Sequence, residues 1–392
     1  MSPSPEISTG NDGLDPVEEQ AEAENAINTP FDPKQVEIIT RKFTISALLE
    51  RLRHNELDLN PDFQRRANLW DTTRKSRLIE SILLRIPLPS FYFSEDEDGN
   101  FSVVDGLQRL CTIFHFIDYA ELNKATGAKV NPLRLENLQY LKDIEDKDFQ
   151  ELDRVFQRRI KELEIEANVI RSSTPKEVMF NVFARLNQGG LPLSSQEIRN
   201  AIFTGDWRKQ IRLLAESEQF KKATQEKIPT DRQQDMEMVL RFVALWALKP
   251  KGQREKNEIL DKFLNDTVKT TLSAWNSNTW GEAKESFFRC LDVAVRIFER
   301  HAFRKSYGNN DLSPINKGVF EAQLLALSKL SENDHAMLIK RKEMVCEKFG
   351  VAISNAESKL SKALRSGTGH SESSNTRIEE FSRIFQETLD VQ

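Results

Sequence analysis

The residues with the clearest chemical potential stand at one corner, where a strand pattern runs directly into a helix pattern. The segment "FSVVDGLQRLCTIFHFI" (101–117) alternates like a strand up to Asp105, and an apolar helical pattern follows Gly106. The first amides of such a helix lack intrahelical partners and carry the positive end of the helix dipole, so they attract phosphate. Gly106 would allow close approach, Arg109 would add a forked cation, and Asp105 would hold Mg²⁺ or orient water. In the alternative interpretation, an ordinary turn, Asp105 caps the helix and Arg109 is solvated.

Two adjacent arginines form a second candidate anion site. Arg65 and Arg66 lie in "FQRRANLW" (63–70), which Pro61 makes extended and turn-like. The alternative is an exposed basic pair, with the flanking aromatic residues in the core.

A glycine turn between two helices is the third candidate. In "FARLNQGGLPLSSQEIRNAI" (183–202), Arg185 and Asn187 stand at the end of one helix, and two glycines would let a ligand approach. The alternative is a plain connection, with Ser194 and Glu197 forming the capping box of the next helix. A DNA-reading helix-turn-helix is disfavoured, because the second helix lacks a run of basic and amide residues.

Several common catalytic and metal-binding patterns are absent from the sequence. None of the five histidines stands at metal-ligand spacing from another histidine or a cysteine, and no His-Asn-His nuclease constellation can be drawn. His115, on an apolar helix face, is expected to be a hydrogen-bonded core residue. The three cysteines are far apart, which argues against disulfides and zinc and favours a reducing cytosol.

The order of the elements predicts an α+β fold with two domains. A strand at 35–40, helices over 44–56 and 72–86, a hairpin across "DEDG" and a strand at 162–171 suggest a mixed domain over 35–204. After about residue 205 only helical patterns remain, so 205–392 should be an all-α domain. The last helix should follow a polar loop at 365–375.

The net charge of −5 comes from the N-terminus, where the first 36 residues hold eight acids and one base. Their composition predicts a disordered acidic tail over 1–34. The remaining chain is close to neutral, so no overall basic field indicates nucleic-acid binding. No run approaches the roughly 20 apolar residues of a membrane span, and the N-terminus does not look like a secretory signal. We therefore expect a cytoplasmic protein without membrane partners.

Four motifs in order and spacing resemble one known family. They are "FQRR…W", "KSRLIESILLRIPLPSFYF", "VVDGLQRL" and "VFARLNQGGLPLSSQEIRNAIF". Together they resemble the N-terminal domain of GmrSD-type restriction systems, a prokaryotic family similar in fold to the ParB/sulfiredoxin group. Two C-terminal segments, "INKGVFEAQLLAL" and "GTGHSESSNTRIEEF", resemble shorter, stand-alone members of this family.

The resemblance implies roles for the corner residues. The family's Asp-Gly-Gln-Gln-Arg (DGQQR) loop matches Asp105, Gly106, Gln108 and Arg109, and such loops in the wider group bind nucleotide phosphates and support NTP hydrolysis. Leu107 replaces the first glutamine, which leaves phosphate binding plausible and weakens the case for hydrolysis.

The other two motifs are carried over in the same way. The Phe-Gln-Arg signature matches Phe63, Gln64 and Arg65, and the Arg-x-Asn turn matches Arg185 and Asn187. In full-length relatives a His-Asn-His nuclease domain cuts modified phage DNA. Because this chain lacks those residues, nuclease activity would require a separate His-Asn-His partner.

Three functions remain open at this stage. The leading hypothesis is a nucleotide-binding, ParB-like NTPase module in anti-phage defence, with NTP and Mg²⁺ held by Arg65, Arg66, Arg109 and Asp105. The rival is a non-enzymatic module that grips DNA phosphates or a protein carboxylate with the same basic corner. Direct nuclease action ranks lowest, because no second carboxylate suited to share a metal with Asp105 is evident. The sequence does not indicate an oligomeric state.

Overall fold

The computed structural model describes residues 36–59, 70–186, 194–230, 232–248, 254–308, 311–365 and 369–391, without the side chains of 177 and 183–186. The chain divides into a sheet unit within Ile27–Gly205 and a helical unit within Asp206–Gln392. Over the described ranges, no helix combines the length and apolar character needed to cross a bilayer.

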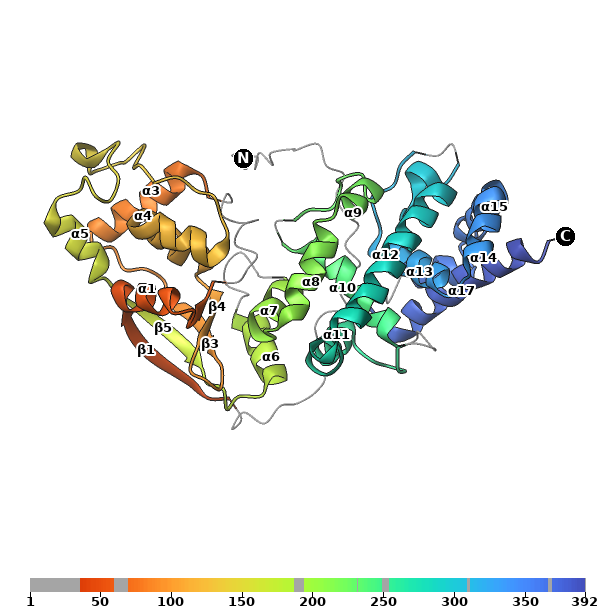
Figure 1. Ribbon diagram of the computed structural model, residues 1–392, viewed down its shortest axis with the longest axis horizontal. Coiled ribbons are helices and arrows are strands. Elements are labelled where there is room, and N and C mark those ends of the chain that lie inside the picture. Colours follow the sequence, from red (N-terminus) through yellow and green to blue (C-terminus); the bar gives the residue numbers. More distant parts are fainter. Residues whose placement is uncertain are drawn as a thin grey trace, which may run out of the picture. The chain divides into compact units, whose positions relative to one another are not determined.

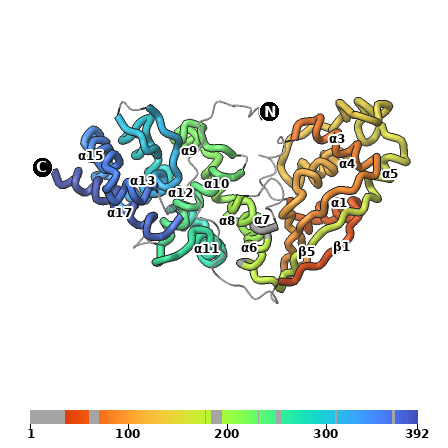
Figure 2. The backbone as a smooth tube through the Cα atoms, turned by 180° about the vertical axis from the view of Figure 1, so that it is seen from behind, coloured from red at the N-terminus to blue at the C-terminus, as the bar shows by residue number. Residues whose placement is uncertain are grey.

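The sheet unit contains a five-stranded mixed sheet with the order β1-β5-β3-β4-β2. β1 (Ile38–Thr44) pairs antiparallel with β5 (Glu164–Ile170) at one edge, seen from behind in Figure 2. β3 (Phe91–Glu95) runs parallel to β5 and antiparallel to β4 (Phe101–Asp105). β2 (Leu57–Asp58) runs parallel to the first two residues of β4 and ends opposite Ser102.

Four helices share one apolar core with this sheet (Figure 1): α1 (Ile45–Arg53), α3 (Thr72–Leu83), α4 (Leu107–Thr126) and α5 (Arg154–Lys161). α1 packs on β1 and β2, α4 and α5 pack on α1, and α3 packs on α4 and α5. The core beneath them is aromatic. The ring centroid of Phe43 lies 6.1 Å from that of Phe93 and 5.5 Å from that of Phe101. This packing fixes the position of β4, and with it the corner that leads into α4.

The other face of the sheet is covered at β4. Side chains alternate along a strand, so Val104 points away from the core side of its neighbour Val103. Val104 is nevertheless only 4% exposed, because α7 (Ser195–Ile202) packs against β4. α7 follows α6 (Lys176–Leu186), and the capping box of Ser194 and Glu197 is confirmed at its start.

The helical unit is organised around one central helix, α13 (Lys317–Ser328), which is buried from Lys317 to Leu327. It packs against α10 (Gln234–Ala247), α12 (Ser277–Phe298) and α17 (Ser371–Leu389). The other helices are α8 (Asp206–Ala215), α9 (Glu218–Ala223), α11 (Leu260–Asp266), α14 (Glu332–Lys340), α15 (Lys342–Ser354) and α16 (Lys359–Arg365).

Buried ion pairs join the central helices of this unit. The Arg377 guanidinium of α17 donates to Glu321 of α13, and both side chains are at most 2% exposed. Lys317 Nζ of α13 lies 3.6 Å from Glu237 Oε1 of α10. Glu237 lies in the first turn of α10, where the helix dipole favours a carboxylate.

The predicted α+β class is confirmed, and several details differ from expectation. β1 runs from Ile38 to Thr44 rather than over 35–40, and α3 ends at Leu83, so Ile86 lies beyond the helix and is exposed. The extended segment after residue 57 contributes a short strand, β2, which sequence reasoning did not identify. The last helix begins at Ser371, inside the predicted polar loop of 365–375. Its polar residues were misleading because Ser371 and Ser374 are buried against the rest of the unit.

Candidate functional site

The corner between β4 and α4 depends on a glycine. Gly106 has a φ of 91°, in the left-handed region that other residues rarely adopt. A Cβ atom there would lie 2.3 Å from Cδ1 of Phe91, so a side chain is also excluded by space. Gly106 is itself buried. In this structure the glycine serves the turn and the contact with Phe91, rather than leaving open space for a ligand.

α4 begins immediately after this glycine without a side-chain cap. Gly106 occupies the N-cap position, and the first helical hydrogen bond runs from the Leu110 N–H to the Gly106 carbonyl, 2.9 Å long. The amides of the preceding turn therefore point out of the helix end, with the positive end of the helix dipole. This is the arrangement in which a helix N-terminus accepts an anion.

Arg109, in the first turn of α4, is tied to the strand beside it. Its guanidinium donates to the Pro89 carbonyl, to the Ser90 carbonyl at 3.2 Å and to Asp105 Oδ2 at 3.1 Å. It also lies over the Phe91 ring, 4.4 Å from the centroid. Burial lowers the pKa of Arg109, and the Asp105 carboxylate partly offsets this effect.

These contacts differ from both sequence interpretations of Arg109. The side chain is 14% exposed, so it is neither solvated nor directed into an open hollow. In the described geometry it acts as a latch, because it joins the first turn of α4 to the start of β3. It would reach a phosphate only if its ion pair with Asp105 opened.

Asp105 remains the accessible acid of the corner. It does not cap α4, because its carboxylate faces Arg109, and its side chain is 48% exposed. A register irregularity between β3 and β4 precedes it, where Tyr92 pairs with Asp105 but Phe93 pairs with Val103. Such bulges re-aim side chains and are over-represented next to active sites.

Comparison with family models places this corner within a recognised domain. The model of the GmrSD restriction endonuclease, N-terminal domain, matches residues 45–204. Residues 45–204 are therefore similar to the GmrSD N-terminal domain. The resemblance expected from the four motifs is confirmed for this part of the chain. No curated protein and no solved structure matches the chain.

Several of the other predicted site residues cannot be placed in the GmrSD-like domain. Gln64, Arg65, Arg66 and Asn187 lie outside the described residues, and Arg185 is described only as part of the α6 backbone. Gln108 stands in the first turn of α4, half-buried, beside Arg109. β2 ends at Asp58, whose partner in the parallel strand β4 is Ser102, three residues before Asp105.

Lys75 of the GmrSD-like domain is a candidate residue that sequence reasoning missed. It is 9% exposed in α3, four residues before Ile79 on the apolar stripe, and this misplaced cation was a readable signal. Burial lowers its pKa, and its ammonium interacts electrostatically with the Cys111 thiol in the second turn of α4. Burial also lowers the pKa of nearby His115, whose Nε2 lies 2.7 Å from the Asn131 carbonyl, as expected of a core residue.

A second unforeseen feature of this domain is a polar cluster inside α7. α7, the helix that packs against β4, fully buries the polar side chains of Gln196, Arg199 and Asn200. Arg199 Nη1 donates to Gln196 Oε1 at 2.6 Å, and Gln196 Nε2 donates to Asn200 Oδ1 at 3.0 Å. Both hydrogen bonds lie within α7, so they satisfy part of the polar atoms that this helix buries.

The described residues of the domain do not meet the requirements of a metal site made of protein ligands alone. Within these ranges, no group of three or more His, Cys, Asp and Glu side chains could hold a metal ion. Asp105 could contribute a single carboxylate. A Mg²⁺ ion there would need phosphate oxygens and water as its other ligands, which is usual for Mg²⁺ in nucleotide sites.

Proposed function

We propose that the GmrSD-like domain of this chain binds the phosphates of a nucleoside triphosphate at the corner between β4 and α4. The family match supports the assignment of this protein as a component of a GmrSD-like restriction system. In this account the protein acts in anti-phage defence, and the bound nucleotide alters how the chain meets DNA or a separate His-Asn-His nuclease.

The observation that carries the proposal is the start of α4. The helix opens at Gly106 without a side-chain cap, so its first amides point out at the positive end of the dipole. Arg109 fixes this turn to Pro89 and Ser90, so the amides would be held in place before a ligand arrives. Fixed donors of this kind stabilise phosphate charge without reorganisation.

The remaining corner residues have defined parts in this proposal. Asp105 would hold Mg²⁺ through one carboxylate oxygen, and Gln108 would donate to a phosphate from the first turn of α4. NTP hydrolysis would further require Asp105 to leave Arg109, from which it is 3.1 Å distant. Leu107, where the family motif carries glutamine, supplies no polar group for that step.

Residues beyond the corner complete the proposed site. Arg65 and Arg66 would clasp the phosphates, with Gln64 beside them, because guanidinium groups match phosphate oxygens in pairs. Arg185 and Asn187 would contact the same ligand from the turn after α6.

Titration calorimetry of the full chain with ATP, GTP, CTP and UTP, with and without Mg²⁺, tests the proposal. We expect one nucleotide to bind with a micromolar Kd, about −8 kcal/mol. Asp105→Asn should abolish the gain in affinity that Mg²⁺ provides, because the carboxylate that would hold the metal is lost, and preserve the Mg²⁺-free binding, because the asparagine Oδ1 can still accept the hydrogen bond from Arg109. Arg109→Ala should weaken binding about tenfold or more, because the first turn of α4 loses its latch.

The matched control is Asp98→Asn, which changes an exposed acid in the turn between β3 and β4. It should bind nucleotide like the wild type. If none of the four nucleotides binds, or if Arg109→Ala binds nucleotide as tightly as the wild type, the corner between β4 and α4 is not the nucleotide site. Phosphate release that persists in Asp105→Asn would show that this carboxylate does not take part in hydrolysis.

One observation favours a second candidate function, a non-enzymatic binding module. The Asp105 carboxylate is engaged by Arg109, an arrangement that suits binding without turnover. The same α4 amides would then hold DNA phosphates. A steep dependence of DNA binding on salt, unchanged by any nucleotide, would favour this function over the first.

A further inference from the structure

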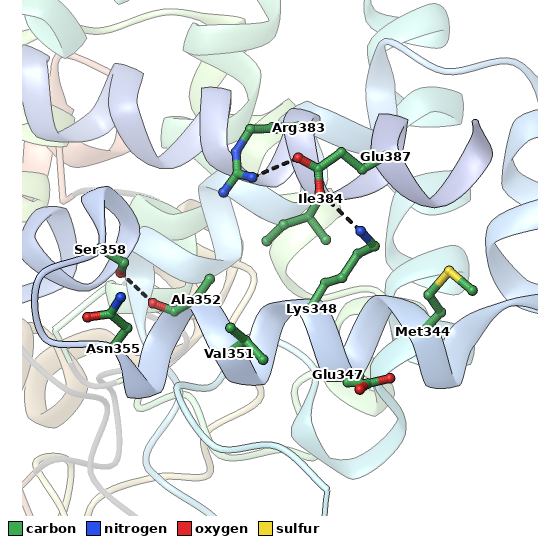
Figure 3. Close-up of a pocket in the computed structure, with 10 residues that line it drawn as sticks. All are labelled: Met344, Glu347, Lys348, Val351, Ala352, Asn355, Ser358, Arg383, Ile384 and Glu387. Carbon is green, nitrogen blue, oxygen red and sulfur yellow. Dashed lines mark hydrogen bonds and ion pairs between the residues drawn. The ribbon is translucent and has the colours of Figure 1, made fainter. Parts of the chain in front are cut away.

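An open groove in the helical unit separates α15 from α17 (Figure 3), with a volume of about 510 Å³. Its apolar lining includes Met344, Val351 and Ile384, and Val351 is 67% exposed. An aliphatic side chain this exposed at the mouth of a groove gains free energy when a second surface covers it.

Charged side chains lie between these apolar residues. Lys348 Nζ lies 3.1 Å from Glu387 Oε2, and Arg383 Nη1 lies 2.7 Å from Glu387 Oε1, so the carboxylate of α17 already serves two cations. Glu347 is exposed and makes no ion pair within the described part of the chain. The groove therefore offers an acid that makes no ion pair in the described chain, beside Lys348, which shares Glu387 with Arg383; Arg383 also pairs with Glu380 at 2.7 Å.

The order of these residues along α15 is self-complementary. Met344, Glu347, Lys348 and Val351 lie on one stripe of the helix, at spacings of three, four and seven residues. If a second α15 ran antiparallel about a two-fold axis between Glu347 and Lys348, Met344 would face Val351 of the other copy. Each Glu347 would then face the Lys348 of the other copy.

We propose that this groove is the homodimer interface of the protein and that its occupant is α15 of a second copy of the chain. The reciprocal match between apolar and charged residues is what an isologous two-fold contact requires, because the same surface must complement itself. Each Glu347 gains the cation it lacks in one chain, and both copies of Val351 become covered. This inference does not depend on the proposed nucleotide site.

Sedimentation equilibrium of the full chain over a concentration series tests the proposal. The wild type should reach a mass twice the 45.2 kDa of the chain. Val351→Glu should be monomeric at every concentration, because it buries a charge against Met344 of the other copy. Glu347→Lys should raise the dimer Kd about tenfold, since two weak attractions become two repulsions. The double variant Glu347→Lys/Lys348→Glu should recover part of the wild-type affinity, because it restores opposite charges across the axis, although the Lys348–Glu387 ion pair within each chain is lost.

The control variant is Glu285→Lys, which reverses an exposed acid on α12 outside the groove and should leave the Kd unchanged. Thermal melting establishes that each variant is folded; Glu347→Lys is the safest, because Glu347 is exposed. A wild-type chain that stays monomeric at all concentrations would overturn the proposal. So would a dimer whose Kd is unaffected by Val351→Glu, or a double variant no better than Glu347→Lys alone.

Discussion

Single residues at the corner have roles that their types alone do not reveal. Arg109 is the residue type that most often binds phosphate, yet its guanidinium donates hydrogen bonds to Pro89, Ser90 and Asp105. Gly106 looks like a residue that admits a ligand, yet its open side is filled by Phe91. In both cases the sequence identifies an important position, and the neighbouring strand decides what the residue does there.

Gly106→Ala should destabilise the protein by about 2–4 kcal/mol, the sum of a left-handed backbone and an overpacked contact with Phe91. Gly99→Ala is the matched control. Gly99 also has a positive φ, of 80°, but a Cβ there would meet no atom within 4 Å. It should cost only about 1–2 kcal/mol. Urea unfolding measures both values, and equal costs would show that Phe91 does not restrict the corner.

Helices and strands were more predictable than the fates of individual side chains. The hairpin of β3 and β4, the capping box of α7 and the stripe of α3 follow from local patterns, and the structure confirms them. β2 was missed because its two residues are a strand only through pairing with β4, more than forty residues away. The burial of Lys75 likewise depends on α4, a different element.

The ion pair between α13 and α17 gives a prediction at this scale. Arg377→Met leaves the Glu321 carboxylate buried, with the Ser374 hydroxyl at 3.0 Å as a neutral donor. We expect a loss of stability of about 1–3 kcal/mol, below the roughly 3–5 kcal/mol of a buried charge with no cation near it, because Arg241 and Arg254 still interact electrostatically with Glu321. Adding Glu321→Gln should recover most of it, because the charge is removed. Urea unfolding of the full chain checks this, and a double variant less stable than Arg377→Met would contradict it.

At the scale of the whole molecule, the sheet unit and the helical unit carry separate inferences. The family match covers residues 45–204, which contain the corner, whereas the proposed dimer groove lies in α15 and α17. The α+β class and the succession of elements could be predicted because periodicity is a local property. The candidate residues Gln64, Arg65, Arg66 and Asn187 stay predictions, since they lie outside the described residues.

The central claim is that nucleotide phosphates bind the first amides of α4. Amide hydrogen exchange of the full chain, with and without the nucleotide and Mg²⁺, tests this most directly. The account predicts slower exchange over Leu107, Gln108 and Arg109 when nucleotide is bound, because phosphate oxygens accept these hydrogens. Unchanged exchange at these three residues, with protection appearing elsewhere in the chain, would contradict it.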